Sequence, residues 1–167
     1  RAMGMSYPGG VHLDKIAEQG DENAFTLPHP TVQGSPFDFS FSGLKTAVIN
    51  LIHNASQKGE QLPVADLSAS FRKAVVDCLL KNVILAMNDT NYKKLVIAGG
   101  VSANSLLRRR LQQECKEKGW EIHMPALNLC GDNAAMVGAQ AYYEFLAGKI
   151  AGMDLNACAA MPIDNNF

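Results

Sequence analysis

The spacing of apolar residues predicts two substantial helices in the first half of the chain. Apolar positions recur every three or four residues from Ser42 to Ser56 and again through LPVADLSASFRKAVVDCLLKNVILAMNDT, which is the period of one buried helix face. We expect Ser42 to cap the first helix, and Pro63 and Asp66 to suit the first turn of the second. The residues of the second helix expected to face inward are Val64, Leu67, Phe71, Val75, Cys78, Leu79 and Val83.

The second half alternates strand and helix patterns. The run KKLVIAGG is short, aliphatic and bounded by charge and glycine, which predicts a buried parallel strand. A helix from Ala103 to about Lys118, a second strand in WEIHM and a last helix in GDNAAMVGAQAYYEFLAG follow it. This order predicts an α/β layer with a right-handed crossover.

The remaining stretches have weaker patterns. Residues 1–40 are broken by proline and glycine and predict an irregular lead-in with one short helix from about Gly10 to Gln19, whereas residues 42–147 form the expected helical and α/β core. Within FDFSFSGLKT, alternation suggests that Phe37, Phe39 and Phe41 form one buried strand face. Residues after Gly148 are expected to be irregular.

Composition limits the function classes. A chain of 167 residues, 47% of them hydrophobic, predicts a single domain over residues 1–167, and the net charge of -1 gives no general attraction to nucleic acids or membranes. No apolar run is long enough to span a membrane, and four scattered cysteines without a C-x-x-C pair predict reduced thiols and a cytoplasmic location. Because the chain opens on RAMGMSYPGG, we expect it to be a piece of a longer protein.

The turn after the first predicted strand is the main candidate binding site. Gly99 and Gly100 end the strand where backbone N–H groups and a helix dipole point outward, a place where anions and nucleotides bind, and Ser102 and Asn104 are expected at its lip. A simple chain reversal is the alternative. The arginines of LLRRRL span too much of a helix to form one flat patch and predict a mainly solvated face, with one of them free to reach a partner.

A second candidate lies in LNLCGDNAAMVGA. Asp132 comes where a loop gives way to a helix, so it is either an N-cap or a carboxylate ligand for a divalent metal. Lys45 is either simply exposed or placed to meet an anion. The four histidines lack the spacing of a zinc site.

Four stretches together resemble one family. YPGG at 7–10, DFSFSGLKT at 38–46, AGGVSAN at 98–104 and DN at 132–133 are similar, in order and approximate spacing, to the carboxyl-terminal half of the tRNA threonylcarbamoyladenosine transferases, TsaD, formerly called Gcp or O-sialoglycoprotein endopeptidase. The resemblance implies one lobe of the actin-like ATPase fold, the ASKHA fold, with a mixed sheet flanked by several helices. It also implies that Gly10 and Asn104 contact an adenylate, that Gly99 and Gly100 allow close backbone approach, and that Asp132 binds a metal.

The implied activity is transfer of threonylcarbamoyl from threonylcarbamoyl-AMP to N6 of adenosine 37 of tRNA. The implied cofactor is iron or zinc, and the implied partners are tRNA, a paralogous subunit and a small ATPase. The family's H-x-x-x-H and serine-glycine-glycine motifs are absent, and Gly131 stands where threonine is usual before the aspartate. Because a lone aspartate binds metal poorly, we expect this chain alone to bind metal weakly or not at all and to be inactive. We also expect it to self-associate through apolar surface that the missing lobe would cover.

Two alternatives stay open: a non-catalytic scaffold that dimerises with a paralogue, and the carboxyl lobe of a sugar or acetate kinase. A peptidase is not expected, because no nucleophile with a base and no zinc-protease motif is present.

Overall fold

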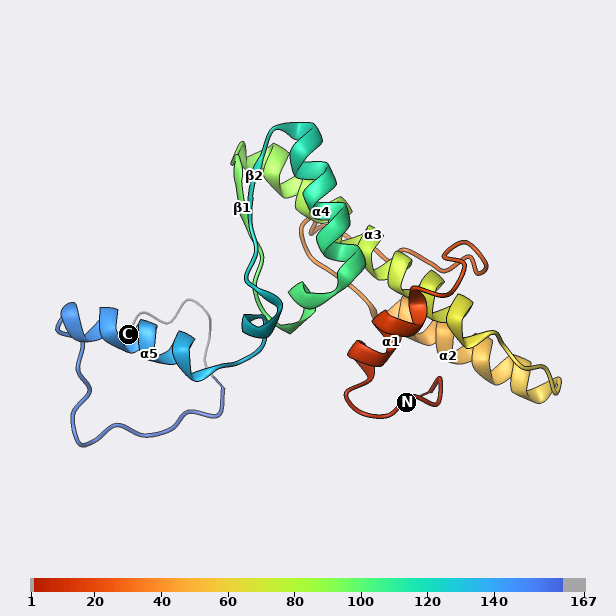
Figure 1. Cartoon of the computed structure of the whole chain (residues 1–167), viewed down its shortest axis with the longest axis horizontal. Coiled ribbons are helices and arrows are strands. Elements are labelled where there is room, and N and C mark those ends of the chain that lie inside the picture. Colours follow the sequence, from red (N-terminus) through yellow and green to blue (C-terminus); the bar gives the residue numbers. More distant parts are fainter. Residues whose placement is uncertain (1, 161–167) are drawn as a thin grey trace. The chain divides into compact units, whose positions relative to one another are not determined.

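The computed structural model describes residues 2–160 and divides into two compact units, one ending at Cys130 and the other beginning at Gly131. The first unit holds four α-helices and a small sheet, and the second holds one α-helix (Figure 1). The expectation of a single domain over residues 1–167 stays a prediction.

Three helices open the first unit. The expected short helix, the expected helix from Ser42 and the expected long helix are all confirmed, as α1 (Gly9–Ala17), α2 (Ser42–Gln57) and α3 (Val64–Thr90). The expected cap at Ser42 is wrong, because the helix already includes Ser42 and the N-cap position falls on Phe41, which makes no side-chain cap bond. Pro63 likewise precedes α3 and occupies its N-cap position in an extended conformation.

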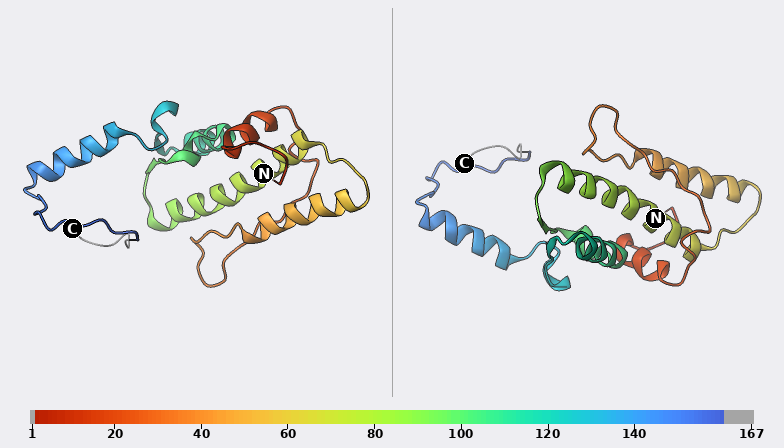
Figure 2. Two further views of the ribbon diagram at one scale, coloured as in Figure 1. Left: turned by 90° about the horizontal axis from the view of Figure 1, so that it is seen from below. Right: turned by 90° about the horizontal axis from the view of Figure 1, so that it is seen from above.

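The helices α2 and α3 lie side by side (Figure 2) and bury a shared apolar cluster. Leu44 and Val48 of α2 meet Ala74 of α3, and Leu27 from the preceding loop completes the cluster. Most of the residues of α3 expected to face inward are buried or packed at the edge of a cluster, but Val64 is exposed. Removal of these apolar surfaces from water holds the pair together.

Two backbone segments lie in direct contact where the chain after α1 meets the first turn of α3. A Cβ placed on Gly20, just after α1, would overlap the backbone of Ala65 and Asp66 in the first turn of α3. The Asp66 carboxylate also accepts a hydrogen bond from the backbone N–H of Asp21, 2.9 Å away. Glycine at position 20 therefore lets two backbones come into direct contact.

The strands and the fourth helix follow in the expected order. Strand β1 (Lys94–Val96) pairs in parallel with β2 (Glu121–His123), and the 3₁₀ helix η1 (Gly100–Ala103) and α4 (Ser105–Lys118) connect them. A second 3₁₀ helix, η2 (Leu127–Leu129), comes after β2. The expected α/β pattern is confirmed as helices with a two-stranded parallel sheet; within residues 2–160 no antiparallel pair occurs, and the mixed sheet stays a prediction.

The sheet packs one face onto the helices. Leu95, Ile97 and Ile122 lie against a core made by α3 and α4, in which Val76 and Leu111 are buried. Val96 points the other way and is 68% exposed. The prediction of a buried strand is therefore half wrong, because alternate side chains of β1 lie on opposite faces and the described residues cover only one.

The aromatic segment before α2 is not a strand. Phe37, Phe39 and Phe41 are 41%, 46% and 37% exposed, so the predicted buried strand face is wrong. The rings of Phe39 and Phe41 stack on each other with centroids 6.2 Å apart. Alternation alone did not distinguish a strand from a loop that turns at Phe37, where the Asp38 N–H bonds to the Ser35 carbonyl, and that is anchored by a hydrogen bond from the Asn82 amide to the carbonyl of Asp38. Lys45 is exposed, as its simpler interpretation predicts.

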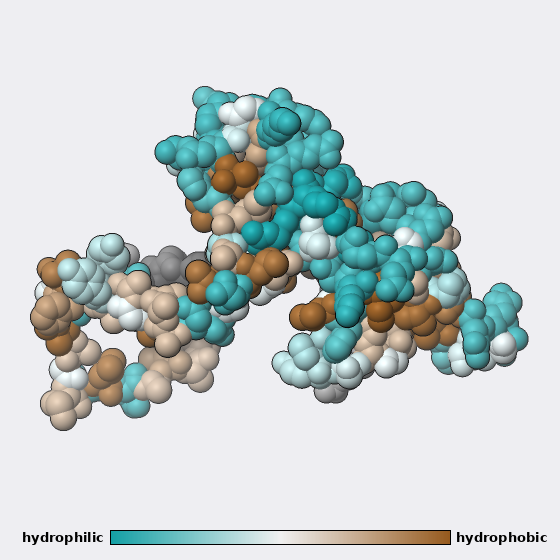
Figure 3. All heavy atoms as spheres, viewed as in Figure 1, coloured by the Kyte–Doolittle hydropathy of each residue, from teal (hydrophilic) through white to brown (hydrophobic). Residues whose placement is uncertain are grey.

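The second unit consists of α5 (Ala134–Leu146) and the segment after it. The helix agrees with the prediction, and residues 149–160 form no regular element, as expected; residues 161–167 lie outside the described part. None of the residues of α5 is buried, and the surface of this unit in Figure 3 is coloured largely from white to brown. Among residues 2–160, no helix is both long enough and apolar enough to cross a membrane.

Candidate adenylate-binding site

The glycine turn is built at the carboxyl end of β1. Gly99 has φ +81° and ψ 169°, a conformation that disfavours residues with a Cβ, and it directly precedes η1. Ser102 is buried, and its hydroxyl donates to the carbonyl of Gly99 at 2.6 Å. The expectation that Ser102 offers its side chain at the lip is therefore wrong, because its buried hydroxyl is bonded to the backbone of the turn itself.

Asn104 occupies the junction between η1 and α4. Its Oδ1 accepts from the backbone N–H of Leu107 at 2.9 Å, which makes it the N-cap of α4. Its Nδ2 donates to Oδ1 of Asp14 in α1 at 3.0 Å. The side-chain amide is thus held on both sides, with one N–H left over.

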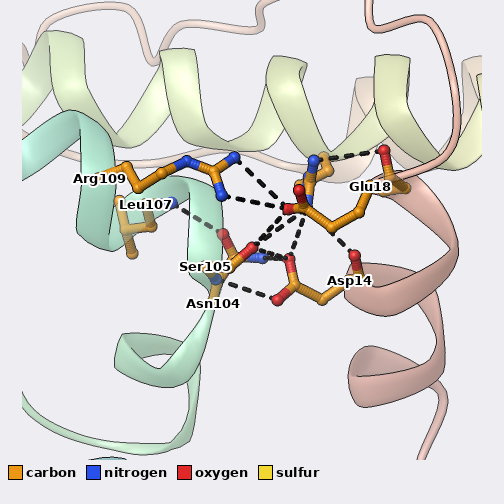
Figure 4. Close-up of polar contacts among 8 residues, drawn as sticks. Asp14, Glu18, Asn104, Ser105, Leu107 and Arg109 are labelled. Atoms are coloured by element: carbon orange, nitrogen blue, oxygen red, sulfur yellow. Dashed lines mark hydrogen bonds and ion pairs between the residues drawn. The ribbon is translucent and has the colours of Figure 1, made fainter.

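A group of six polar residues surrounds this junction, and we call it the Arg72 cluster (Figure 4). Its members come from α1 and the residue after it, from α3, and from α4 and the residue before it: Asp14, Glu18, Arg72, Asn104, Ser105 and Arg109. Sequence reasoning missed Asp14, Glu18, Arg72 and Ser105. One signal was available: the two carboxylates are four residues apart, which puts them on one face of the expected short helix.

The fold lowers the pKa of Glu18. Hydrogen bonds from Arg72, at 2.6 Å, and from Ser105 lower the pKa of Glu18 from its ordinary 4.5 to about 2, and the charges of Arg72 and Arg109 act in the same direction. The ionised form is therefore the one that the fold stabilises.

This shift predicts an acid-sensitive stability. The contribution of Glu18 is complete above pH 4.5 and is lost as the pH falls from 4.5 towards 2, where the carboxylate becomes protonated in the folded state as well. Because 46% of the side chain is exposed and solvent screens the pair, we expect a loss of about 1 kcal/mol. Urea unfolding at several pH values should show a steeper decline for the wild type than for Glu18→Gln across this window; parallel curves would contradict the assignment.

The three consecutive arginines of α4 make separate intramolecular contacts. Arg108 donates to the carbonyls of Ser102 and Pro125 at 3.0 and 2.9 Å, and so ties the glycine turn to the loop after β2. Arg109 pairs with Glu18, and Arg110 pairs with Asp77 of α3 at 3.3 Å. The predicted solvated face is wrong for Arg108, whose guanidinium is bonded to backbone carbonyls. It is incomplete for Arg109 and Arg110, because each of them also pairs with a carboxylate.

The glycines expected at the site have free space in front of them. A Cβ at Gly10, Gly99 or Gly100 would meet no atom within 4 Å among the described residues. Gly10 lies one helical turn before Asp14 on α1, so the contact between Asp14 and Asn104 brings that end of α1 towards the start of α4. Packing therefore does not explain glycine at positions 10 and 100, which leaves room for a ligand.

Asp132 lies in the second unit, just before α5. The N-cap of α5 is Asn133, whose Oδ1 accepts from the backbone N–H of Met136 at 3.0 Å, so the interpretation of Asp132 as the cap is wrong. Asp132 is exposed. Across residues 2–160 no three His, Cys, Asp or Glu side chains gather closely enough to hold a metal ion, so these residues alone do not fit the metal site that the resemblance implies.

The cysteines are unpaired thiols in the part of the chain that is described, in agreement with the expectation. Burial raises the pKa of Cys78 and of Cys115 above the ordinary value. Neither thiol is therefore suited to act as a nucleophile.

Comparison with known proteins identifies the group to which these features belong. The model of the TsaD family, described as tRNA N6-adenosine threonylcarbamoyltransferase, matches residues 1–139. The chain belongs to this family. The match confirms the resemblance carried by the four stretches, and it favours the transferase expectation over the kinase alternative.

Individual relatives give the same result. A protein of Clostridium botulinum (strain Kyoto / Type A2) named tRNA N6-adenosine threonylcarbamoyltransferase is 46% identical over 157 residues, which cover 94% of this chain and 46% of the relative. Relatives with the same name from Clostridium beijerinckii and Moorella thermoacetica are 43% and 42% identical, over 94% and 98% of this chain. The chain spans about half the length of the curated relatives it matches.

Proposed function

We propose that this chain forms the adenylate-binding half of an enzyme that transfers threonylcarbamoyl from threonylcarbamoyl-AMP to N6 of adenosine 37 of tRNA, in the cytoplasm. The names of the relatives and the family match support this activity. The same membership supports an actin-like ATPase lobe as the larger fold into which the two-stranded sheet and its helices fit.

One observation carries the assignment of the site. Two glycine-containing segments far apart in sequence, at the start of α1 and at the end of β1, are linked through the bond between Asp14 and Asn104, and the glycines have open space in front of them. A ligand with a flat base and a phosphate needs such backbone access.

Each proposed contact has its own task. Gly99 and Gly100 let the backbone approach the nucleotide, and Gly10 does so from α1. The unused N–H of Asn104 donates to the nucleotide, because the other groups of its amide are already bonded. Holding the adenylate in one orientation lowers the barrier by placing the carbamoyl carbon where the tRNA amine can reach it, and AMP then leaves.

We further propose that Asp132 supplies one carboxylate to a metal site, iron or zinc, whose other ligands lie outside the described residues. When bound, the metal would supply charge stabilisation to the phosphate or carbonyl. The chain's residues otherwise bind and orient the substrate.

The proposed partners are tRNA, a paralogous subunit and a small ATPase. Self-association of the isolated chain is proposed as well, since α5 carries exposed apolar side chains such as Val137 and Phe145. Light scattering should show a mass that grows with concentration; a constant monomer mass would contradict it.

The activity is tested best in a full-length frame. We would replace the matching 157-residue stretch of the Clostridium botulinum relative with the corresponding residues of this chain and incubate the chimaera with threonylcarbamoyl-AMP and unmodified tRNA. We expect the modified nucleoside and AMP in equal amounts, and no product from the isolated chain. A chimaera that folds, binds tRNA and forms no product would contradict the proposed function.

A further inference from the structure

Arg72 is the most buried charged group of the cluster that carries its name. Arg72 is 5% exposed and lies in the first half of α3, followed by the buried apolar residues Ala74 and Val76. NH1 lies 3.0 Å from Oδ1 of Asp14, 2.6 Å from Oε1 of Glu18 and 3.2 Å from the hydroxyl of Ser105. NH2 donates to the backbone carbonyl of Ala17 at 3.3 Å. One guanidinium therefore joins α1, α3 and α4.

Burial of the Arg72 guanidinium is energetically unfavourable if the side chain only fills space in the core. Burying a guanidinium requires the loss of its hydration, and an apolar side chain of similar volume commonly stabilises a core as well or better. In addition, Nε of Arg72 has no hydrogen-bond partner among the described residues. A buried N–H without a partner loses its hydrogen bonds to water and gains none in return, which is destabilising. Stability alone thus does not account for arginine at this position.

The carboxylate of Asp14 links Arg72 to Asn104. Oδ1 of Asp14 accepts from both NH1 of Arg72 and Nδ2 of Asn104, each at 3.0 Å. Oδ2 of the same carboxylate accepts from the backbone N–H of Ser105 at 3.0 Å. Arg72 therefore fixes the carboxylate that in turn fixes the Asn104 amide at the start of α4.

We propose that Arg72 is a positioning residue for the adenylate site, which acts through Asp14 to hold the Asn104 side chain in its binding orientation. It also fixes the carboxyl-terminal end of α1 against α3, because Glu18 and the Ala17 carbonyl are bonded to the same guanidinium. This inference rests on the proposed function, since it names a support for that same site.

Loss of the guanidinium would release this constraint. Without it, the Asp14 carboxylate is held only by Ser105 and Asn104 and gains rotational freedom, so the acceptor of the Asn104 amide is fixed less firmly. The nucleotide would then have to order these groups on binding, which weakens affinity more than it slows the chemical step. Lysine at position 72 would keep the charge but not the fork that reaches two helices at once.

Two measurements test the inference separately from the activity. In the 167-residue chain, NMR should show the two Nδ2 protons of Asn104 with widely separated shifts, and Arg72→Met should bring them together. In the chimaera, Arg72→Met should raise KM for threonylcarbamoyl-AMP about tenfold with less than a threefold change in kcat, and Arg72→Lys should fall between. If Arg72→Met does not fold, Arg72→Lys carries both comparisons.

A matched control is Arg110→Met, which removes an arginine that pairs with Asp77 away from the cluster. This variant should leave both the Asn104 amide and KM unchanged. An Asn104 spectrum unaffected by loss of Arg72, or equal changes in KM for the Arg72 and Arg110 variants, would overturn the positioning role. A wild-type chimaera without transfer activity would instead count against the proposed function, and the NMR comparison would still decide the role of Arg72.

Discussion

Replacing Gly20 with alanine is expected to lower the free energy of unfolding by about 3 kcal/mol. The new Cβ would overlap the backbone of Ala65 and Asp66, and backbone atoms cannot move aside as a flexible side chain can. Relief requires α1 to shift away from α3, which also weakens the bonds from Arg72 to Asp14 and Glu18. Overpacking of this kind commonly costs about 1–3 kcal/mol, and a backbone-to-backbone overlap belongs at the upper end.

Urea denaturation followed by circular dichroism measures this loss. Gly9→Ala is the matched control, because position 9 lies at the other end of α1 and a Cβ there would meet no atom within 4 Å. Alanine within a helix removes backbone freedom from the unfolded chain, so the control should be neutral or stabilised by about 0.5 kcal/mol. Equal stability of the two variants would show that α1 does not dock on α3 in this way.

Replacing Asn104 has the second large effect, and three substitutions separate its roles. Asn104→Ala removes the cap of α4 and the bond to Asp14, and we expect a loss of about 2 kcal/mol in stability. Asn104→Ser keeps a capping oxygen and should retain most of the stability. Asn104→Asp also keeps the cap, but it places a second carboxylate within about 3 Å of Asp14, where like charges repel.

The order of the three Asn104 variants in substrate binding should differ from their order in stability. In the chimaera, we expect all three to raise KM for threonylcarbamoyl-AMP at least tenfold, with Asn104→Asp the worst, because each removes the N–H proposed to reach the nucleotide. Steady-state kinetics alongside urea unfolding separates the two effects. A serine variant with normal KM would limit Asn104 to a capping role.

The apolar pattern predicted the helices well because each has a clear face. The expected positions of α2 and α3 agree closely with the structure. Leu44 and Val48 of α2 lie at helical spacing and are buried, and the same is true of Leu67 and Cys78 of α3. Pattern failed at the exact helix ends. Ser42 and Asp132 both had the residue type of a cap, yet Phe41 and Asn133 hold the N-cap positions.

The candidate site was predicted only in part, because its polar network is tertiary. Asn104 and the glycine turn lie together in sequence and could be found there. The link from Asn104 to Asp14 joins residues 90 positions apart, and Arg72 enters from a third helix. No local pattern specifies which carboxylate meets which arginine. The sequence therefore predicted a mainly solvated face with one arginine reaching a partner, whereas all three arginines of α4 have partners.

The most direct test of the account is an NMR titration of the ¹⁵N-glycine-labelled chimaera with AMP. The amide resonances of Gly10, Gly99 and Gly100 should move together with one dissociation constant, while that of Gly20, which lies against the first turn of α3, stays in place. Gly10, Gly99 and Gly100 resonances that remain fixed at AMP concentrations sufficient to inhibit transfer would contradict an adenylate site at the end of β1.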